Sequence, residues 1–126
     1  LNSKPWVILF LKPDQVDCHR AFAEFKNMAV TWKGALRFGW VNRLENELLA
    51  ESFNVRQLPQ VFLLKAGTAY WYRDFPTETT LSRYIAEEAY FKSSTKFAQP
   101  KRFFGIQLYL YTYPRNEIRY LYATYL

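Results

Sequence analysis

The sequence of 126 residues predicts an α/β fold, a three-layer sandwich in which helices cover both faces of a mixed central sheet. Its first strand, residues 6–11, is apolar at every position, which is typical of a strand that is covered on both faces. Strand and helix patterns then alternate, and this alternation favours parallel neighbours in the sheet. Two later strand patterns joined by a short turn add an antiparallel edge.

The first half of the chain contains two predicted helices and a second strand. Residues 15–32 have helical spacing, and their inward apolar side chains are Cys18, Phe22, Phe25, Met28, Ala29 and Trp32. Lys33 and Gly34 end this helix, and residues 36–41 predict the second strand. Residues 45–53 predict a short helix. Its inner side is expected to carry Leu48, Leu49 and Phe53.

The second half predicts a hairpin and a third helix. Residues 60–65 and 69–73 have strand composition, and the Ala66-Gly67 turn between them makes a hairpin. Thr77 is a suitable N-cap for a helix that runs to about residue 91. The inward side chains expected for this helix are Leu81, Tyr84, Ile85 and Ala89.

Charge divides the chain into two parts. Residues 1–91 hold 11 Lys and Arg against 10 Asp and Glu, whereas residues 92–126 hold six against Glu117 alone. Six of the ten tyrosines also fall in the second part. We therefore predict one domain at 1–92, followed by a linker and a basic, aromatic tail at 93–126.

Within the tail, residues 93–100 are polar and linker-like, and residues 106–113 and 118–125 alternate around a turn, which predicts a C-terminal β-hairpin extension. Lys and Arg interleaved with Tyr could instead contact phosphates and stack on bases. The charges are sparse and the aromatic residues alternate as in a packed strand, which argues against a nucleic-acid partner. A sheet extension, an oligomer contact or the start of a following domain fits better.

Composition excludes several classes of protein. Half of the residues are apolar and a fifth are aromatic, which argues against overall disorder. No run of about 18 apolar residues occurs, so we expect no membrane span within this chain. Cys18 and His19 are the lone cysteine and histidine, so we expect no disulfide, no metal site and no cofactor. The start at Leu1 without a signal-like segment predicts a fragment or a processed piece.

Over roughly residues 4–91 the chain resembles the thioredoxin-like family. The matching features are the apolar strand, the Phe10-x-x-Pro13 motif, the four-residue slot from Gln15 to Cys18, and the helix that follows. The segment 54–59, followed by the hairpin, is similar to the family's cis-proline loop. The family's first strand and helix are not evident, so we expect an N-terminal strand and helix to be missing.

The resemblance also implies what this chain lacks. Active members carry Cys-x-x-Cys in the slot, whereas here the first position is Gln15 and only Cys18 is retained. Asp14 stands where an aromatic residue usually precedes the slot, and Leu9 stands where the family has a buried acid. An amide cannot form the thiolate that attacks a disulfide. We therefore expect a vestigial slot, no catalytic residue and no dithiol oxidoreductase activity.

The cis-proline loop indicates the function that remains. In the family, main-chain groups beside this proline pair with extended peptides, a contact that needs no sulfur. The resemblance therefore implies a redox-inactive module that binds protein or unfolded peptide. Its candidate peptide-binding residues are Pro13, Gln15, Leu58, Pro59 and Gln60.

The resemblance is strongest to protein disulfide isomerase relatives and to chaperones that also carry a J-domain. It implies a protein-folding context, with a possible Hsp70-linked partner, in the endoplasmic reticulum; the cytoplasm is the alternative location. The alternative function is a monothiol redox or thiol-sensing role through Cys18, with a pKa lowered by the helix N-terminus and Arg20. Asp14 and Asp17 would oppose this, and an inert buried thiol is the simpler interpretation.

Overall fold

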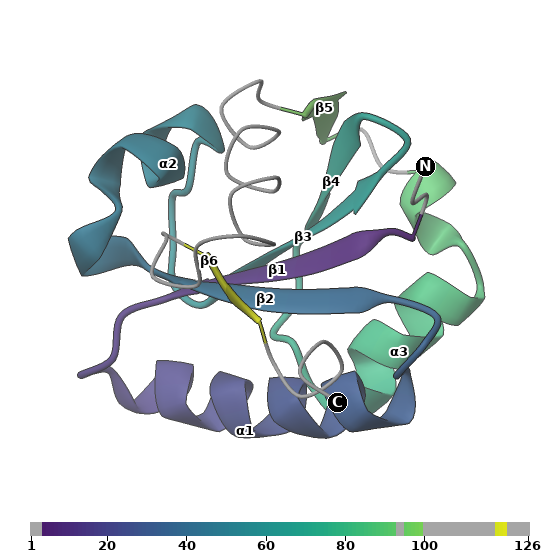
Figure 1. Cartoon of the computed structure of the whole chain (residues 1–126), viewed down its shortest axis with the longest axis horizontal. Coiled ribbons are helices and arrows are strands. Elements are labelled where there is room, and N and C mark those ends of the chain that lie inside the picture. The colour runs from purple at the N-terminus through teal and green to yellow at the C-terminus, as the bar shows by residue number, and fades with distance from the viewer. Residues whose placement is uncertain (1–3, 93–94, 100–117, 121–126) are drawn as a thin grey trace.

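The computed structural model describes residues 4–92, 95–99 and 118–120, and Figure 1 shows how their helices and strands are arranged. The strands are β1 (Trp6–Leu11), β2 (Arg37–Asn42), β3 (Gln60–Lys65), β4 (Thr68–Tyr72), β5 (Lys96–Ala98) and β6 (Ile118–Tyr120). The α-helices are α1 (Val16–Thr31), α2 (Glu47–Ser52) and α3 (Glu78–Ala86). Two short 3-10 helices, η1 (Arg43–Glu45) and η2 (Ala89–Lys92), complete the described part.

The strands form one mixed sheet in the order β5-β4-β3-β1-β2-β6. β1 pairs parallel with β2, in a register that places Ile8 opposite Gly39. On its other side β1 pairs antiparallel with β3, which places Ile8 opposite Phe62. The helix between β1 and β2 supplies the crossover that a parallel pair requires, and the β3–β4 hairpin supplies the antiparallel pairing. The predicted mixed α/β sandwich is confirmed.

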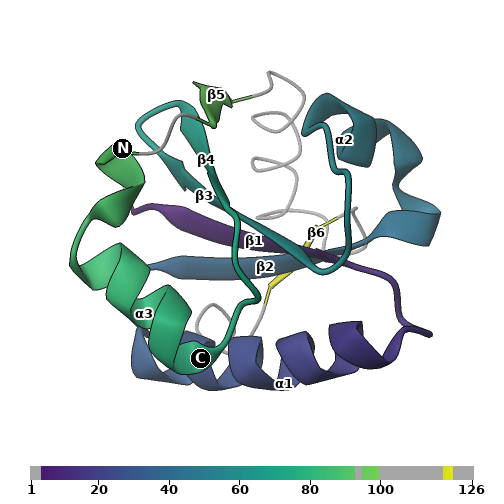
Figure 2. The same cartoon turned by 180° about the vertical axis from the view of Figure 1, so that it is seen from behind.

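Helices lie on both faces of this sheet. Figures 1 and 2 show α1 and α3 together on one face and α2 on the opposite face. Because side chains alternate along a strand, Val7, Leu9 and Leu11 of β1 join the core beneath α1 and α3. The intervening residues of β1, among them Ile8 and Phe10, join the core beneath α2. All six residues of β1 are buried, which explains why this strand is apolar throughout.

The face that carries α1 and α3 is tied together across long sequence separations. The indole of Trp32 donates to Ser82 Oγ at 3.1 Å, which joins the end of α1 to α3. Glu24 of α1 accepts a hydrogen bond from the main-chain N–H of Glu78 at 2.6 Å. Thr77 caps α3 by accepting from Thr80 N at 3.1 Å, so the predicted N-cap is confirmed.

Two details of the predicted helices are wrong. Leu48 is 62 % exposed, whereas Leu49 and Phe53 are buried, because residues four apart share a helix face and adjacent residues diverge. The third helix ends at Ala86 rather than near residue 91. Glu88 has a φ of 55°, a left-handed conformation that interrupts the α-helix before η2 begins.

Part of the expected linker belongs to the sheet. β5 pairs antiparallel with β4, which places Phe97 opposite Ala69, and the ring of Phe97 lies 5.8 Å from that of Phe62. β5 forms because it pairs with the open edge of β4 and because Phe97 contacts Phe62. The polar composition of this segment gave no indication of a strand. β6 pairs antiparallel with β2. The rest of the predicted tail hairpin lies outside the described residues, so the hairpin and the division at residue 92 stay predictions.

Candidate functional site

Two segments of the predicted site meet at one end of the sheet. The antiparallel register places Phe10 opposite Gln60, so Leu11 and Pro59 are the next residues of their segments at that end. Beyond Leu11 the chain turns, with Gln15 N donating to Lys12 O at 3.1 Å, and α1 begins at Val16. The Leu58–Pro59 peptide bond is cis, which is the isomer that the family resemblance implies. The structure therefore brings the slot and the proline loop together.

The predicted binding residues differ in how they are exposed. Pro13 and Gln15 are exposed, and Leu58 and Pro59 are half-buried. Gln60 as a whole residue is only 1 % exposed and its side chain points into the molecule, so the predicted contribution of Gln60 to a surface here is wrong.

An apolar pocket of about 250 Å³ lies beside this turn. It lies between the end of β1, the first turns of α1 and the middle of β2. Its lining residues are Leu11, Pro13, Cys18, His19, Phe22 and Trp40. The rings of Phe22 and Trp40 meet edge to face, with centroids 5.4 Å apart, and form one wall. Val16, 81 % exposed, begins the helix that carries Cys18, His19 and Phe22.

Cys18 forms part of the floor of the pocket and is only 1 % exposed. Its Sγ accepts a hydrogen bond from Lys12 N at 3.3 Å and donates to Gln15 Oε1 at 3.5 Å. Burial raises the pKa of the Cys18 thiol above its ordinary value, and the charges of Asp17 and Asp14 raise it further. The hydrogen bond from Lys12 opposes the shift without reversing it. The group is therefore a neutral thiol at neutral pH.

The other residues that thiol chemistry would require are absent or engaged elsewhere. Leu9, at the position of the family's buried acid, is fully buried in the apolar core beneath α1. The guanidinium of Arg20 lies 4.3 Å from the centroid of the Phe75 ring, so it stacks on that ring. Within the described part of the chain, no group of three or more His, Cys, Asp or Glu residues could hold a metal ion.

Sequence reasoning missed the aromatic wall of the pocket. Helical spacing placed Phe22 on the same inward face as Cys18, one turn later, but it was assigned to the core and not to a pocket. Trp40 lies opposite Leu9 in the parallel register of β1 and β2. No signal in the sequence fixes that register, so the contribution of Trp40 emerges only from the structure.

No protein-family model and no curated protein matches the chain. Solved structures do match. The J-Trx1 fragment of ERdj5 has a TM-score of 0.63 and 23 % identity, over 68 % of this chain and 43 % of that fragment. The chain has a thioredoxin-like fold. It thus spans less than half the length of the ERdj5 fragment that it matches.

Two further thioredoxin-like structures match to a similar degree. Thioredoxin-2, described as a component of malaria parasite protein secretion machinery, has a TM-score of 0.65 and 23 % identity over 69 % of this chain and 85 % of its own. The first thioredoxin domain of mouse protein disulfide-isomerase A4 has a TM-score of 0.59 and 22 % identity, over 68 % of this chain and 64 % of its own. Among the described residues, no helix is long and apolar enough to cross a membrane.

Proposed function

We propose that the chain is a redox-inactive thioredoxin-like module that binds extended protein segments at the surface formed by Pro13, Gln15, Leu58 and Pro59. One observation carries this proposal. An apolar pocket opens beside the exposed turn at Pro13, at the same end of the sheet as the cis Leu58–Pro59 bond. Such a pocket can receive an apolar side chain while main-chain groups of the two loops hold the backbone of the peptide.

The state of Cys18 supports a role in binding rather than in redox chemistry. Disulfide exchange needs an accessible thiolate to attack and a second thiol to resolve the mixed disulfide. Cys18 is 1 % exposed, the pKa of its thiol is raised by burial, and the first slot position holds the amide of Gln15. Cys18 instead contributes an apolar surface to the pocket floor, as buried free cysteines do. These features oppose the monothiol alternative.

The cellular context is proposed from the matching structures. They include thioredoxin-like domains of ERdj5, of human ERp44 and of mouse protein disulfide-isomerase A4. We propose by analogy that this module acts in protein folding in the endoplasmic reticulum, in a chaperone assembly that could be linked to Hsp70. Its ligand would be an unfolded segment with an apolar side chain, because the pocket is lined mainly by apolar groups.

A peptide titration tests the proposal. A fluorescent, extended peptide with one central Leu or Phe is titrated with the wild-type chain and with Leu58→Asp, and binding is followed by anisotropy. We expect Leu58→Asp to weaken binding about tenfold or more, since it places a charge beside an apolar contact. Leu48→Asp is the matched control, because Leu48 is exposed on α2 and lies outside the surface. Equal affinity for wild type and Leu58→Asp would refute the proposal.

A second variant guards against loss of the fold. Leu58 packs against both apolar cores, so a charge there also lowers the free energy of unfolding. Val16→Asp places the charge directly after Gln15 of the proposed surface, at the first, exposed residue of α1, where the helix dipole favours an acidic side chain. We expect this variant to keep the wild-type melting temperature and to bind the peptide more weakly. An unchanged affinity of a folded Val16→Asp would count against the surface.

A further inference from the structure

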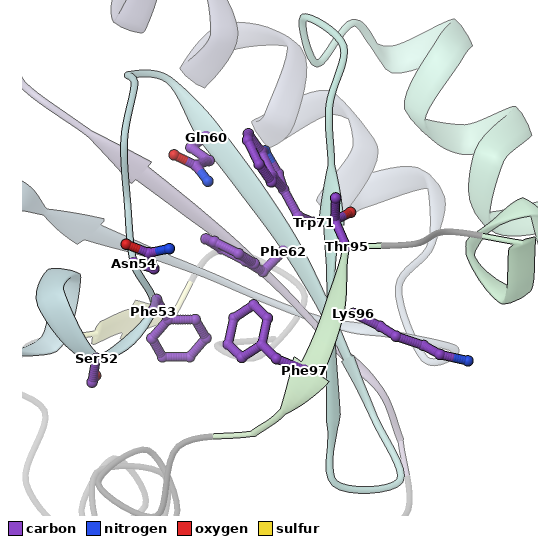
Figure 3. Close-up of a pocket in the computed structure, with 9 residues that line it drawn as sticks. All are labelled: Ser52, Phe53, Asn54, Gln60, Phe62, Trp71, Thr95, Lys96 and Phe97. Atoms are coloured by element: carbon purple, nitrogen blue, oxygen red, sulfur yellow. The ribbon is translucent and has the colours of Figure 1, made fainter.

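A second pocket, of about 330 Å³, lies on the opposite face of the sheet from α1. It is enclosed by the end of α2, the strands β3 and β4, and β5. Figure 3 shows its residues, with the rings of Phe53, Phe62 and Phe97 gathered below Gln60. Centroids of neighbouring rings lie 5.2 Å apart for Phe53 and Phe62 and 6.2 Å apart for Phe53 and Phe97. Four of the nine lining residues are aromatic and the other five are polar, and the peptide-binding proposal makes no use of this pocket.

The amide of Gln60 has one orientation that its surroundings allow. Its Oε1 accepts from the main-chain N–H groups of Arg56 and Gln57, at 2.9 and 3.2 Å. Two donors at one end of an amide require the oxygen there, so the other end is the NH2 group. In Figure 3 the oxygen points toward the segment before β3, and the nitrogen points toward the aromatic rings. That nitrogen is buried and has no hydrogen-bond partner within the described part of the chain.

Trp71 of β4 supplies a second donor of the same kind. Its Nε1 is also buried without a hydrogen-bond partner among the described residues. An indole N–H can only donate, as can the NH2 group of Gln60. The guanidinium of Arg73 stacks 4.7 Å from the centroid of the Trp71 ring and helps to hold it in place. Two residues that line the pocket thus carry buried hydrogen-bond donors that have no acceptor among the described residues.

These features define the chemistry of a ligand. Aromatic walls favour a flat, apolar body, and two unpartnered donors favour an acceptor oxygen on that body. Lys96 lines the pocket, but Figure 3 shows its side chain pointing away from the rings, so a negative charge is not required. We propose that this pocket binds a small, uncharged aromatic molecule whose carbonyl oxygen accepts hydrogen bonds from Gln60 Nε2 and Trp71 Nε1. This site is separate from the peptide surface, and its ligand is an aryl amide, lactam or ketone.

Benzamide is a suitable test molecule for the full 126-residue chain. It is titrated into ¹⁵N-labelled protein, and the indole N–H resonance of Trp71 is identified by its loss in Trp71→Phe. We expect this resonance and the side-chain NH2 resonances of Gln60 to shift and to saturate. Benzylamine has the same ring but at neutral pH carries a cationic donor in place of the carbonyl group. It should bind at least about fivefold more weakly, the loss expected for one hydrogen bond.

Two variants make the same substitution in the two pockets. Trp71→Phe keeps an aromatic wall and removes the donor, so benzamide affinity should fall about fivefold. Trp40→Phe, in the other pocket, should leave that affinity within about twofold because distant sites act independently. The proposal is overturned if the Trp71 resonance does not saturate, if Trp71→Phe binds benzamide as the wild type does, or if benzylamine binds equally well. Peptide binding is measured in a separate experiment, so a negative result with benzamide does not bear on the proposed peptide surface.

Discussion

The reactivity of Cys18 toward an alkylating reagent provides a sharp test of the redox-inactive account. Alkylation needs a thiolate that the reagent can reach. Burial and the charges of Asp14 and Asp17 raise the pKa of Cys18 above its ordinary value of 9.0. At pH 7 the ionised fraction is therefore below about 1 %, and Cys18 is also only 1 % exposed. Both effects slow the reaction, and modification must await local opening of the start of α1.

The assay compares iodoacetamide modification of the folded chain, of the chain in urea and of a free thiol such as glutathione. At pH 7 we expect the folded chain to react at least about tenfold more slowly than the chain in urea, because only an opened state exposes the sulfur. The rate should keep rising with pH beyond 8, since ionisation of a thiol with a raised pKa is far from complete there. A fast reaction that already reaches its plateau near pH 7 would refute the reasoning and favour the monothiol alternative.

Three further predictions concern stability. Tyr84→Phe should leave the free energy of unfolding at pH 7 unchanged or raise it by up to about 1 kcal/mol, because the Tyr84 hydroxyl is buried without a hydrogen-bond partner among the described residues. Burial raises the pKa of Tyr84 to about 12, whereas the pKa in the unfolded chain is about 10. The free energy of unfolding of the wild type therefore falls as pH rises from about 10 to about 12. Urea melts of Tyr84→Phe should show a smaller fall over the same range. In chemical denaturation, Leu49→Ala should lower the free energy of unfolding by about 2–5 kcal/mol because Leu49 is buried. Leu48→Ala should change it by no more than about 0.5 kcal/mol because Leu48 is exposed. Equal effects would contradict the orientation of α2. Thr77→Ala should lower stability by about 1 kcal/mol through loss of the bond from Thr80 N, and Thr77→Ser, which keeps a capping hydroxyl, should restore most of it.

Local sequence patterns were enough to predict much of the fold. The continuous apolar run at residues 6–11 identified the central strand because β1 is buried on both faces. Helical spacing from Cys18 to Trp32 and the N-cap at Thr77 identified α1 and the start of α3. The bounds and inward faces of short or interrupted elements were predicted less accurately. The six residues of α2 span less than two turns, and the prediction placed the adjacent residues Leu48 and Leu49 on one side, although only Leu49 lies four residues from Phe53.

The candidate site depended on contacts between distant segments. The slot at Gln15 and Cys18 and the loop at Pro59 were recognisable as motifs, and the register of β1 and β3 brings them together. Two outcomes of side-chain direction could not be foreseen. Gln60 follows Pro59 directly, yet its side chain enters the opposite core because strand residues alternate between the two faces. Trp40 reaches the pocket beside Cys18 only through the pairing of β1 with β2.

The central claim is that an extended peptide binds at the end of β1 without help from a reactive thiol. The most direct measurement maps a bound peptide on the ¹⁵N-labelled chain by chemical-shift perturbation, for the wild type and for Cys18→Ala. We expect shifts that cluster at Gln15, Leu58 and the Trp40 indole N–H, with similar affinity for both proteins. Shifts confined to other surfaces, or loss of binding by a folded Cys18→Ala, would contradict it.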